Sequence, residues 1–215
     1  MLLEVCHDLL QPGVSILDIG SGRTPAIPID ARPADCRYVG LDISRDELAK
    51  APAGAYTETR VGDATLIQES LVGRFDLVIT WQVLEHVQST QRAIDCMHAY
   101  LKPGGMMVSM LSGKNTLFAI PNRIIPFKLS VFAMEKLLRR QPDTVFPAVY
   151  DLCSYDELSG ALSTWKTRDI RRFWRGASYV RFSAVLERLY LFAENHLRRN
   201  DKRNFATHYL IVATR

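Results

Sequence analysis

The stretch Ile16-Leu-Asp-Ile-Gly-Ser-Gly-Arg-Thr-Pro25 decides the fold. It reads as a buried strand that runs directly into two glycines, Gly20 and Gly22. Glycine permits a tight turn and lets the backbone approach a ligand closely, and open α/β sheets bind their ligands at the carboxyl ends of the strands. The stretch therefore predicts an α/β fold with a binding loop after the first strand.

Three further runs are also hydrophobic almost without interruption, which is typical of strands covered on both faces in a parallel sheet. The chain between the runs is long enough for crossover helices. The four strong strands are predicted over Val14–Gly20, Tyr38–Ile43, Phe75–Thr80 and Met106–Leu111, the last preceded by a turn at Lys102-Pro-Gly-Gly105. Weaker strands are predicted over Tyr56–Gly62, Lys166–Phe173 and Thr207–Thr214. Helices are predicted over Met1–Leu10, Arg45–Ala51, Ser89–Leu101, Val131–Arg140, Ser154–Leu162 and Phe182–Arg199.

Length and composition indicate one globular domain over residues 1–215, with 47% hydrophobic and 23% charged residues. The cysteines, Cys6, Cys36, Cys96 and Cys153, lie far apart and form no CxxC pair, so neither a zinc site nor a disulfide framework is indicated. We expect a cytoplasmic protein, because the first residues carry acids and no apolar run is long enough for a transmembrane segment.

The net charge of +4 conceals an asymmetry between the two halves. Residues 1–113 carry 9 Lys and Arg against 14 Asp and Glu, whereas residues 114–215 carry 18 against 9. A basic second half favours an anionic substrate, then a phospholipid surface, then nucleic acid. A solvated basic face without a partner is the equally weighted alternative.

The pattern changes after Gly113, where prolines interrupt an apolar and basic stretch. We interpret residues 113–150 as a substrate-side insertion, since long irregular segments in compact domains usually carry function. The alternative is that this segment only extends the edge of the domain and does not bind substrate. Residues 166–215 complete the domain with C-terminal strands and a helix, and the apolar positions of Phe182–Arg199 indicate core or dimer packing rather than a membrane anchor.

Asp42 ends the second strong strand, about 20 residues beyond Gly20, where a carboxylate can accept both hydroxyls of a ribose. Pro25 stands at the third position of a GxGxxG motif, and no Lys-Ser/Thr pair follows, so a dinucleotide fingerprint and a P-loop are both disfavoured. Two strand-end acids around a glycine turn together predict a site for an adenosine moiety.

These residues resemble class I S-adenosylmethionine-dependent methyltransferases of the small-molecule type 11 or 12. Asp18, Gly20 and Gly22 match the family loop DxGxGxG, with Thr24 in place of the third glycine. Val61-Gly-Asp-Ala64, Phe75–Val87 and Leu101–Met106 match the later motifs in order. The resemblance implies a Rossmann-like, seven-stranded, mostly parallel sheet in a three-layer sandwich with helices on both faces.

The same resemblance implies S-adenosyl-L-methionine as cofactor and S-adenosyl-L-homocysteine as product. The cofactor-binding residues that it implies are Asp18, Gly20, Ser21, Gly22, Asp42, Ile43, Asp63, Ala64, Trp81 and Gln82. Asp63 would contact the adenine amino group, and Trp81 would stack on the adenine or wall the acceptor pocket, with a core position as the alternative.

Glu85-His86 follows the fourth strand, where the methyl acceptor enters in this family. His86 is the candidate general base, since an imidazole suits proton removal at neutral pH. The alternative is that Leu84-Glu-His86 packs and caps the helix at Ser89. Gln82 stands where metal-dependent quinone methyltransferases carry a carboxylate, so we expect no metal.

We expect methyl transfer to an oxygen of a small molecule, such as a sugar or natural-product intermediate, with a nitrogen acceptor as the less favoured alternative; the basic second half is compatible with an anionic acceptor. The alternatives are a lipid or quinone methyltransferase, an RNA methyltransferase, or a non-catalytic binding protein with this fold. Arginines and aromatics alternate over residues 168–181, but no RNA-binding module accompanies them, which disfavours nucleic acid. Peripheral membrane contact and a homodimer both stay open.

Overall fold

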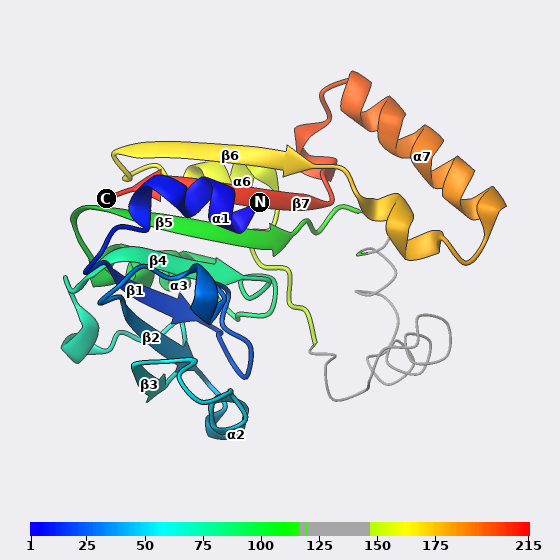
Figure 1. The fold of residues 1–215 in the computed structure, drawn as a ribbon. Coiled ribbons are helices and arrows are strands. Elements are labelled where there is room, and N and C mark those ends of the chain that lie inside the picture. The colour runs from blue at the N-terminus through cyan, green and yellow to red at the C-terminus, as the bar shows by residue number, and fades with distance from the viewer. Residues whose placement is uncertain (117–118, 120–146) are drawn as a thin grey trace.

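The computed structural model describes residues 1–116, 119 and 147–215. Seven strands form one sheet in the order β3-β2-β1-β4-β5-β7-β6 (Figure 1). Their bounds are β1 Ser15–Ile19, β2 Arg37–Asp42, β3 Glu58–Val61, β4 Phe75–Trp81, β5 Leu101–Ser112, β6 Thr167–Phe173 and β7 His208–Thr214. The seven predicted strands are all present, and the Rossmann-like methyltransferase fold is confirmed.

The sheet is parallel from β3 through β5 and antiparallel at β7, which pairs with β5 on one side and β6 on the other. The register places Asp18 beside Gly40 and Ile79, and Asp42 beside Val61. Because the parallel strands all end at the same edge, the loops after β1, β2, β3, β4 and β5 meet there.

Five α-helices accompany the sheet in the described part of the chain. They are α1 Leu2–Cys6, α2 Arg45–Ala49, α3 Thr90–Tyr100, α6 Tyr155–Ala161 and α7 Ala184–Arg199. Short 3-10 segments cover His7–Leu9, Ile29–Ala31, Glu69–Leu71, Gly176–Val180 and Arg203–Phe205. Serines begin three of the helices, because the side chains of Ser44, Ser89 and Ser183 each accept a hydrogen bond from a backbone N–H in the first turn. None of the described helices is both long and apolar enough to cross a membrane.

Alternate side chains of the central strands enter two separate cores. Leu17, Val78 and Met107 pack against residues of α3 and α6, whereas Ile16 and Leu77 pack against α1 and the segment around Ile27. Figure 1 shows α1 on one face of the sheet and α3 with α6 on the other. The three-layer arrangement is therefore confirmed.

Two sequence predictions need correction. The predicted turn at Lys102-Pro-Gly-Gly105 lies inside β5, which begins at Leu101 instead of Met106. Phe75 pairs with Leu101, and Leu77 pairs with Met106. Residues 102–105 therefore bulge out of the ladder, and Gly104 takes the positive φ of +80° that the bulge requires. The predicted helix Val131–Arg140, with most of the 113–150 insertion, lies outside the described residues.

The second correction concerns α7, which stands apart from the sheet in Figure 1. Core packing was wrong for Val185, Leu189 and Phe192, which are 68%, 60% and 76% exposed. The helix instead rests on the domain through Tyr190 and Glu194, which are buried. The helical spacing of the sequence predicted that the apolar side of α7 would face the core. The body of the protein contacts a different side of this helix.

Candidate active site

The glycine loop turns sharply at the end of β1. Gly20 and Gly22 have positive φ angles of +70° and +48°, which favour glycine. A Cβ on Gly20 would lie only 2.3 Å from Cγ2 of Val83 in the loop after β4. The Gly20 N–H donates to the carbonyl oxygen of Leu41 over 2.7 Å. The loop is therefore held between the ends of β2 and β4, with no room for a side chain at Gly20.

Asp42 joins this loop to the next crossover. Its Oδ2 accepts from the N–H of Gly22 over 2.9 Å, and its Oδ1 accepts from the N–H of Ser44 over 2.8 Å. Ser44 in turn caps α2. Two carboxylate oxygens offer about four acceptor positions, so Asp42 keeps capacity for the two hydroxyls of a ribose.

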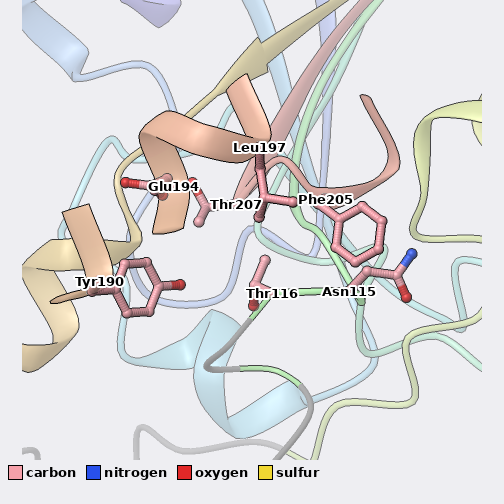
Figure 2. Close-up of a pocket in the computed structure, with 7 residues that line it drawn as sticks. All are labelled: Asn115, Thr116, Tyr190, Glu194, Leu197, Phe205 and Thr207. Carbon is pink, nitrogen blue, oxygen red and sulfur yellow. The ribbon is translucent and has the colours of Figure 1, made fainter. Parts of the chain in front are cut away.

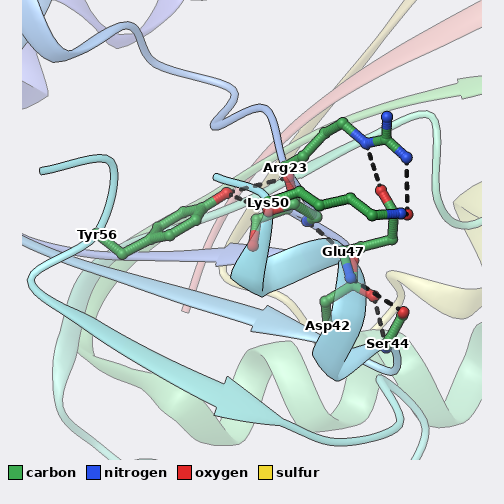
Figure 3. A network of polar contacts seen from close by, with 8 residues as sticks. Arg23, Asp42, Ser44, Glu47, Lys50 and Tyr56 are labelled. Atoms are coloured by element: carbon green, nitrogen blue, oxygen red, sulfur yellow. Dashed lines mark hydrogen bonds and ion pairs between the residues drawn. The ribbon is translucent and has the colours of Figure 1, made fainter. Parts of the chain in front are cut away.

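A polar network that the sequence analysis missed clamps the loop from outside (Figure 3). Arg23 donates from Nε and Nη2 to the two carboxylate oxygens of Glu47, over 2.6 and 2.8 Å. Lys50 adds a bond of 2.9 Å, and hydrogen bonding, first from Arg23 and then from Lys50, lowers the pKa of Glu47 to about 2. The hydroxyl of Tyr56 donates to the carbonyl oxygens of Ser21 and Gly22. The sequence does show an arginine beside the glycines and an acid in the first turn of α2. It does not show that these two side chains contact each other.

Asp18 lies beneath the loop. It is 1% exposed, and its Oδ2 accepts from the hydroxyl of Tyr38 and from the N–H of Ala26, both over 2.7 Å. Burial raises the pKa of Asp18 to about 6, because the charged form loses solvation. These contacts support the loop from the inside, so the geometry gives Asp18 at least a positioning role.

Ser21 carries an unsatisfied polar atom. Its side chain is buried, and its Oγ has no hydrogen-bond partner among the described residues. A Cβ at Gly40 would lie 2.8 Å from that oxygen and 2.7 Å from the ring of Tyr56, so Gly40 leaves the room that both need. A buried hydroxyl without a partner is rare. It suits a site that a ligand or a water molecule completes.

The predicted adenine side lies along the same edge. Ile43, directly after Asp42, is 73% exposed. Asp63 follows β3 and accepts at Oδ1 from the N–H and the hydroxyl of Thr65, both over 2.8 Å. Ala64 is partly buried against the α3-side core. The N–H of Gly62 donates to the carbonyl oxygen of Asp42, which ties the two loops together.

Trp81 is the last residue of β4, and Gln82 follows it directly. Trp81 is partly buried against the α1-side core, which fits the core alternative. Gln82 has a positive φ of +59°, donates its N–H to the carbonyl oxygen of Met110 over 2.7 Å, and accepts at Oε1 from the Ser112 hydroxyl over 2.9 Å. A non-glycine residue in the left-handed region is uncommon and is frequent at functional sites.

Glu85 lies behind this strand end, 2% exposed. Its Oε1 accepts from the N–H of Ser112, whereas Oε2 has no hydrogen-bond partner in the described part of the chain. Burial raises the pKa of Glu85, and the neighbouring His86 opposes that rise. The backbone oxygen of Glu85 accepts from the N–H groups of Val149 and Tyr150. The described end of the 113–150 segment thus contacts this residue.

The His86 ring contacts the backbone of Pro147. Its Nδ1 lies 2.9 Å from the carbonyl oxygen of Pro147. A carbonyl only accepts, so Nδ1 carries the proton, and Nε2 holds the lone pair of the neutral ring. Of the packing and capping alternative, the packing is present, because Leu84 is buried in the α3-side core. The capping is not, because Ser89 caps α3 and the N–H of Thr90 donates to Asp151.

A pocket of about 190 Å³ lies where β5 leaves the sheet (Figure 2). Residues after β5, from α7 and before β7 line it: Asn115, Thr116, Tyr190, Glu194, Leu197, Phe205 and Thr207. Asn115 is three residues beyond Ser112, so the pocket lies on the β5 side of the strand edge. Among the described residues, no three His, Cys, Asp or Glu side chains gather closely enough to hold a metal ion. Metal-free chemistry stays a prediction.

A family model described as a methyltransferase domain matches residues 2–175. The ubiquinone biosynthesis O-methyltransferase of Nitrobacter winogradskyi is 30% identical over 138 residues, covering 60% of this chain and 48% of that protein. Its counterpart in Pseudomonas aeruginosa strain UCBPP-PA14 is 29% identical over 116 residues, covering 50% of each. The chain spans about half the length of these relatives.

Solved structures agree in fold. A phosphoethanolamine N-methyltransferase 2 of Haemonchus contortus, in complex with S-adenosyl-L-methionine, has a TM-score of 0.58 at 12% identity, covering 100% of this chain and 52% of that one. A SAM-dependent methyltransferase of Archaeoglobus fulgidus has a TM-score of 0.56 at 16% identity, covering 100% and 91%. The [4+2]-cyclase SpnF reaches 0.59 at 17% identity, covering 100% and 80%. Such identities show the fold alone. On the strength of the family model, which matches most of its length, the chain belongs to the S-adenosylmethionine-dependent methyltransferases.

Proposed function

We propose that this chain transfers a methyl group from S-adenosyl-L-methionine to a hydroxyl oxygen of a small molecule, in the cytoplasm, with His86 as general base. The observation that supports this most is the contact between His86 Nδ1 and the Pro147 carbonyl. Because this contact places the ring proton on Nδ1, Nε2 is the nitrogen that would accept the proton. A base is needed for a hydroxyl acceptor, because the oxygen loses its proton when it gains the methyl group.

The residues that would bind the cofactor lie at the carboxyl ends of the parallel strands. Asp42 would accept the ribose hydroxyls, Gly20, Ser21 and Gly22 would line the methionine end, and Asp63 would accept from the adenine amino group. Ile43 and Ala64 would flank the adenine, Gln82 would face the reacting methyl, and the part of Trp81 left outside the core would wall the acceptor pocket. The cofactor supplies an electrophilic methyl on a sulfonium. The chain's main task is then to hold donor and acceptor in line.

The acceptor side rests on Glu85, His86 and the segment that contacts them. Val149 and Tyr150 bond to the backbone of Glu85, which supports our assignment of residues 113–150 to acceptor binding within a single domain. After His86 takes the hydroxyl proton, the neighbouring Glu85 carboxylate would stabilise the imidazolium. The pocket in Figure 2 is the candidate recess for the part of the acceptor away from the reacting oxygen.

Two acceptor classes compete. The relatives named for ubiquinone biosynthesis favour a quinone precursor with a ring hydroxyl, whereas the sequence reading favoured a sugar or natural-product intermediate. A non-catalytic protein with the same fold is the third candidate, and an RNA acceptor is the least supported.

The test is methyl transfer from labelled cofactor to a panel of catechols, hydroxylated quinone precursors and sugars. On an accepted substrate, His86→Ala should lower kcat by about 10²–10⁴-fold and should leave the affinity for S-adenosylhomocysteine unchanged. His7→Ala is the matched control, since the His7 side chain is 84% exposed. Near-normal turnover by His86→Ala would contradict the general-base role.

A further inference from the structure

Helix α7 carries an apolar stripe that the described part of the protein leaves exposed. We define the α7 stripe as Phe182, Val185, Leu189 and Phe192, which are 56%, 68%, 60% and 76% exposed. The three helical members are spaced four and three residues apart, so they share one side of the helix. In Figure 1 the helix extends away from the sheet. Exposed apolar residues gathered on one side mark an interaction surface.

The orientation of this stripe is fixed by the contacts on the other side of α7. The carboxylate of Glu194 accepts from the N–H of Gly176 over 2.9 Å. Tyr190 packs so closely on the same glycine that a Cβ there would lie 2.2 Å from its hydroxyl oxygen. Rolling the stripe inward would break both contacts, so the stripe belongs outside.

The charges of α7 are sorted between the two sides. Both acids lie toward the body: Glu194 is buried, and Glu187 is partly buried with its carboxylate 3.6 Å from Arg181. Arg188 and Arg199 are exposed, four residues before and seven residues after Phe192, and therefore flank the stripe. The stripe has positive neighbours along the helix and no acidic one.

We propose that the α7 stripe docks α7 on the surface of an anionic phospholipid membrane. The 16-residue helix would lie in the plane of the interface, with its apolar side among the acyl chains and its arginines at the phosphates. A second copy of the chain fits this side less well, because its own stripe would bring arginines against arginines and no carboxylate to pair with them. This inference does not depend on the acceptor or on the reaction.

The experiment is flotation of the full chain with vesicles of phosphatidylcholine and phosphatidylglycerol, against vesicles of phosphatidylcholine alone. We expect binding to the anionic vesicles that weakens with salt. Val185→Ser/Leu189→Ser/Phe192→Ser should lower the partition coefficient by about tenfold or more. Arg188→Gln/Arg199→Gln should lower it by about 25-fold, since each basic residue near such a surface contributes roughly fivefold.

Matched controls separate the stripe from general surface effects. Ile29→Ser removes an exposed apolar side chain outside α7, and Arg92→Gln removes an exposed arginine of α3. Both should bind like the wild type, and all variants should unfold at the wild-type temperature because the changed side chains are exposed. Wild-type protein that floats with neither vesicle would overturn the proposal. So would undiminished binding by the triple variant, or a dimer in solution that Phe192→Ser dissociates.

Discussion

The carboxylate of Asp42, at the end of β2, accepts a hydrogen bond from the backbone N–H of Gly22 in the loop after β1, over 2.9 Å (Figure 3). Two motifs that lie 20 residues apart in the sequence thereby form one unit. The second oxygen of the same carboxylate holds the N–H of Ser44 at the start of α2. One side chain thus fixes the loop, the crossover helix and the position of any diol that binds there.

Asp42→Ala should therefore weaken S-adenosylhomocysteine binding, and it should also destabilise the glycine loop, because the N–H groups of Gly22 and Ser44 lose their acceptor. Each hydrogen bond to a charged group is worth about 1.5–3 kcal/mol, so losing two ribose contacts predicts at least a hundredfold rise in Kd. Calorimetric titration measures it. Asp46→Ala is the control, because Asp46 is exposed in the first turn of α2. Equal affinity in Asp42→Ala and the wild type would refute the ribose assignment.

Gly20→Ala should lower the free energy of unfolding more than Gly54→Ala does. Both glycines have positive φ, +70° and +78°, but a Cβ at Gly54 meets nothing within 4 Å, whereas one at Gly20 meets Val83. Backbone strain costs about 1–2 kcal/mol at either site. The clash adds about 1–3 kcal/mol at Gly20 alone. Urea unfolding compares the two variants.

The clash also gives a rescue test for Gly20→Ala. Shortening Val83 to Ala in the same chain removes the two methyl groups that the new Cβ would meet at 2.3 and 2.8 Å. The double variant should regain part of the lost stability and of the S-adenosylhomocysteine affinity. If Gly54→Ala proves as damaging as Gly20→Ala, the close approach of the loop to Val83 does not matter.

Asp18 should make stability depend on pH. Burial raises its pKa from the ordinary 3.8 to about 6, so the folded state holds the proton more tightly than the unfolded state. The stabilising contribution of the protonated form is complete below about pH 4 and is lost as pH rises through 6. The shift corresponds to about 3 kcal/mol.

Asp18→Asn should remove this slope. Between pH 4 and pH 7 the wild type should lose about 3 kcal/mol of unfolding free energy relative to the variant, measured by urea unfolding at each pH. Parallel pH profiles for the two proteins would mean that Asp18 ionises as it does in water.

The features that could be predicted from the sequence are those that depend on local residue pattern, namely the strands and the residues at their ends. Near-continuous apolar runs marked the strands, and strand-end positions brought Asp18, Gly20 and Asp42 to one edge, since parallel strands end together. The Arg23–Glu47 and Tyr56 contacts could not be predicted, because they join segments whose distance only the folded chain sets. Ser112 was missed for the same reason, although it contacts both Gln82 and Glu85. Helical spacing identified the apolar residues of α7 but not which of its sides meets the domain.

The most direct test of the central claim is thermal unfolding with and without S-adenosylhomocysteine, with NAD as the control. Ligand at 100 times its Kd adds about 2.7 kcal/mol, which for a chain of this size raises Tm by roughly 5–11 °C. We expect that shift with S-adenosylhomocysteine and none with NAD. Folded protein whose Tm stays unchanged at saturating S-adenosylhomocysteine would show that this chain does not bind the methyltransferase cofactor.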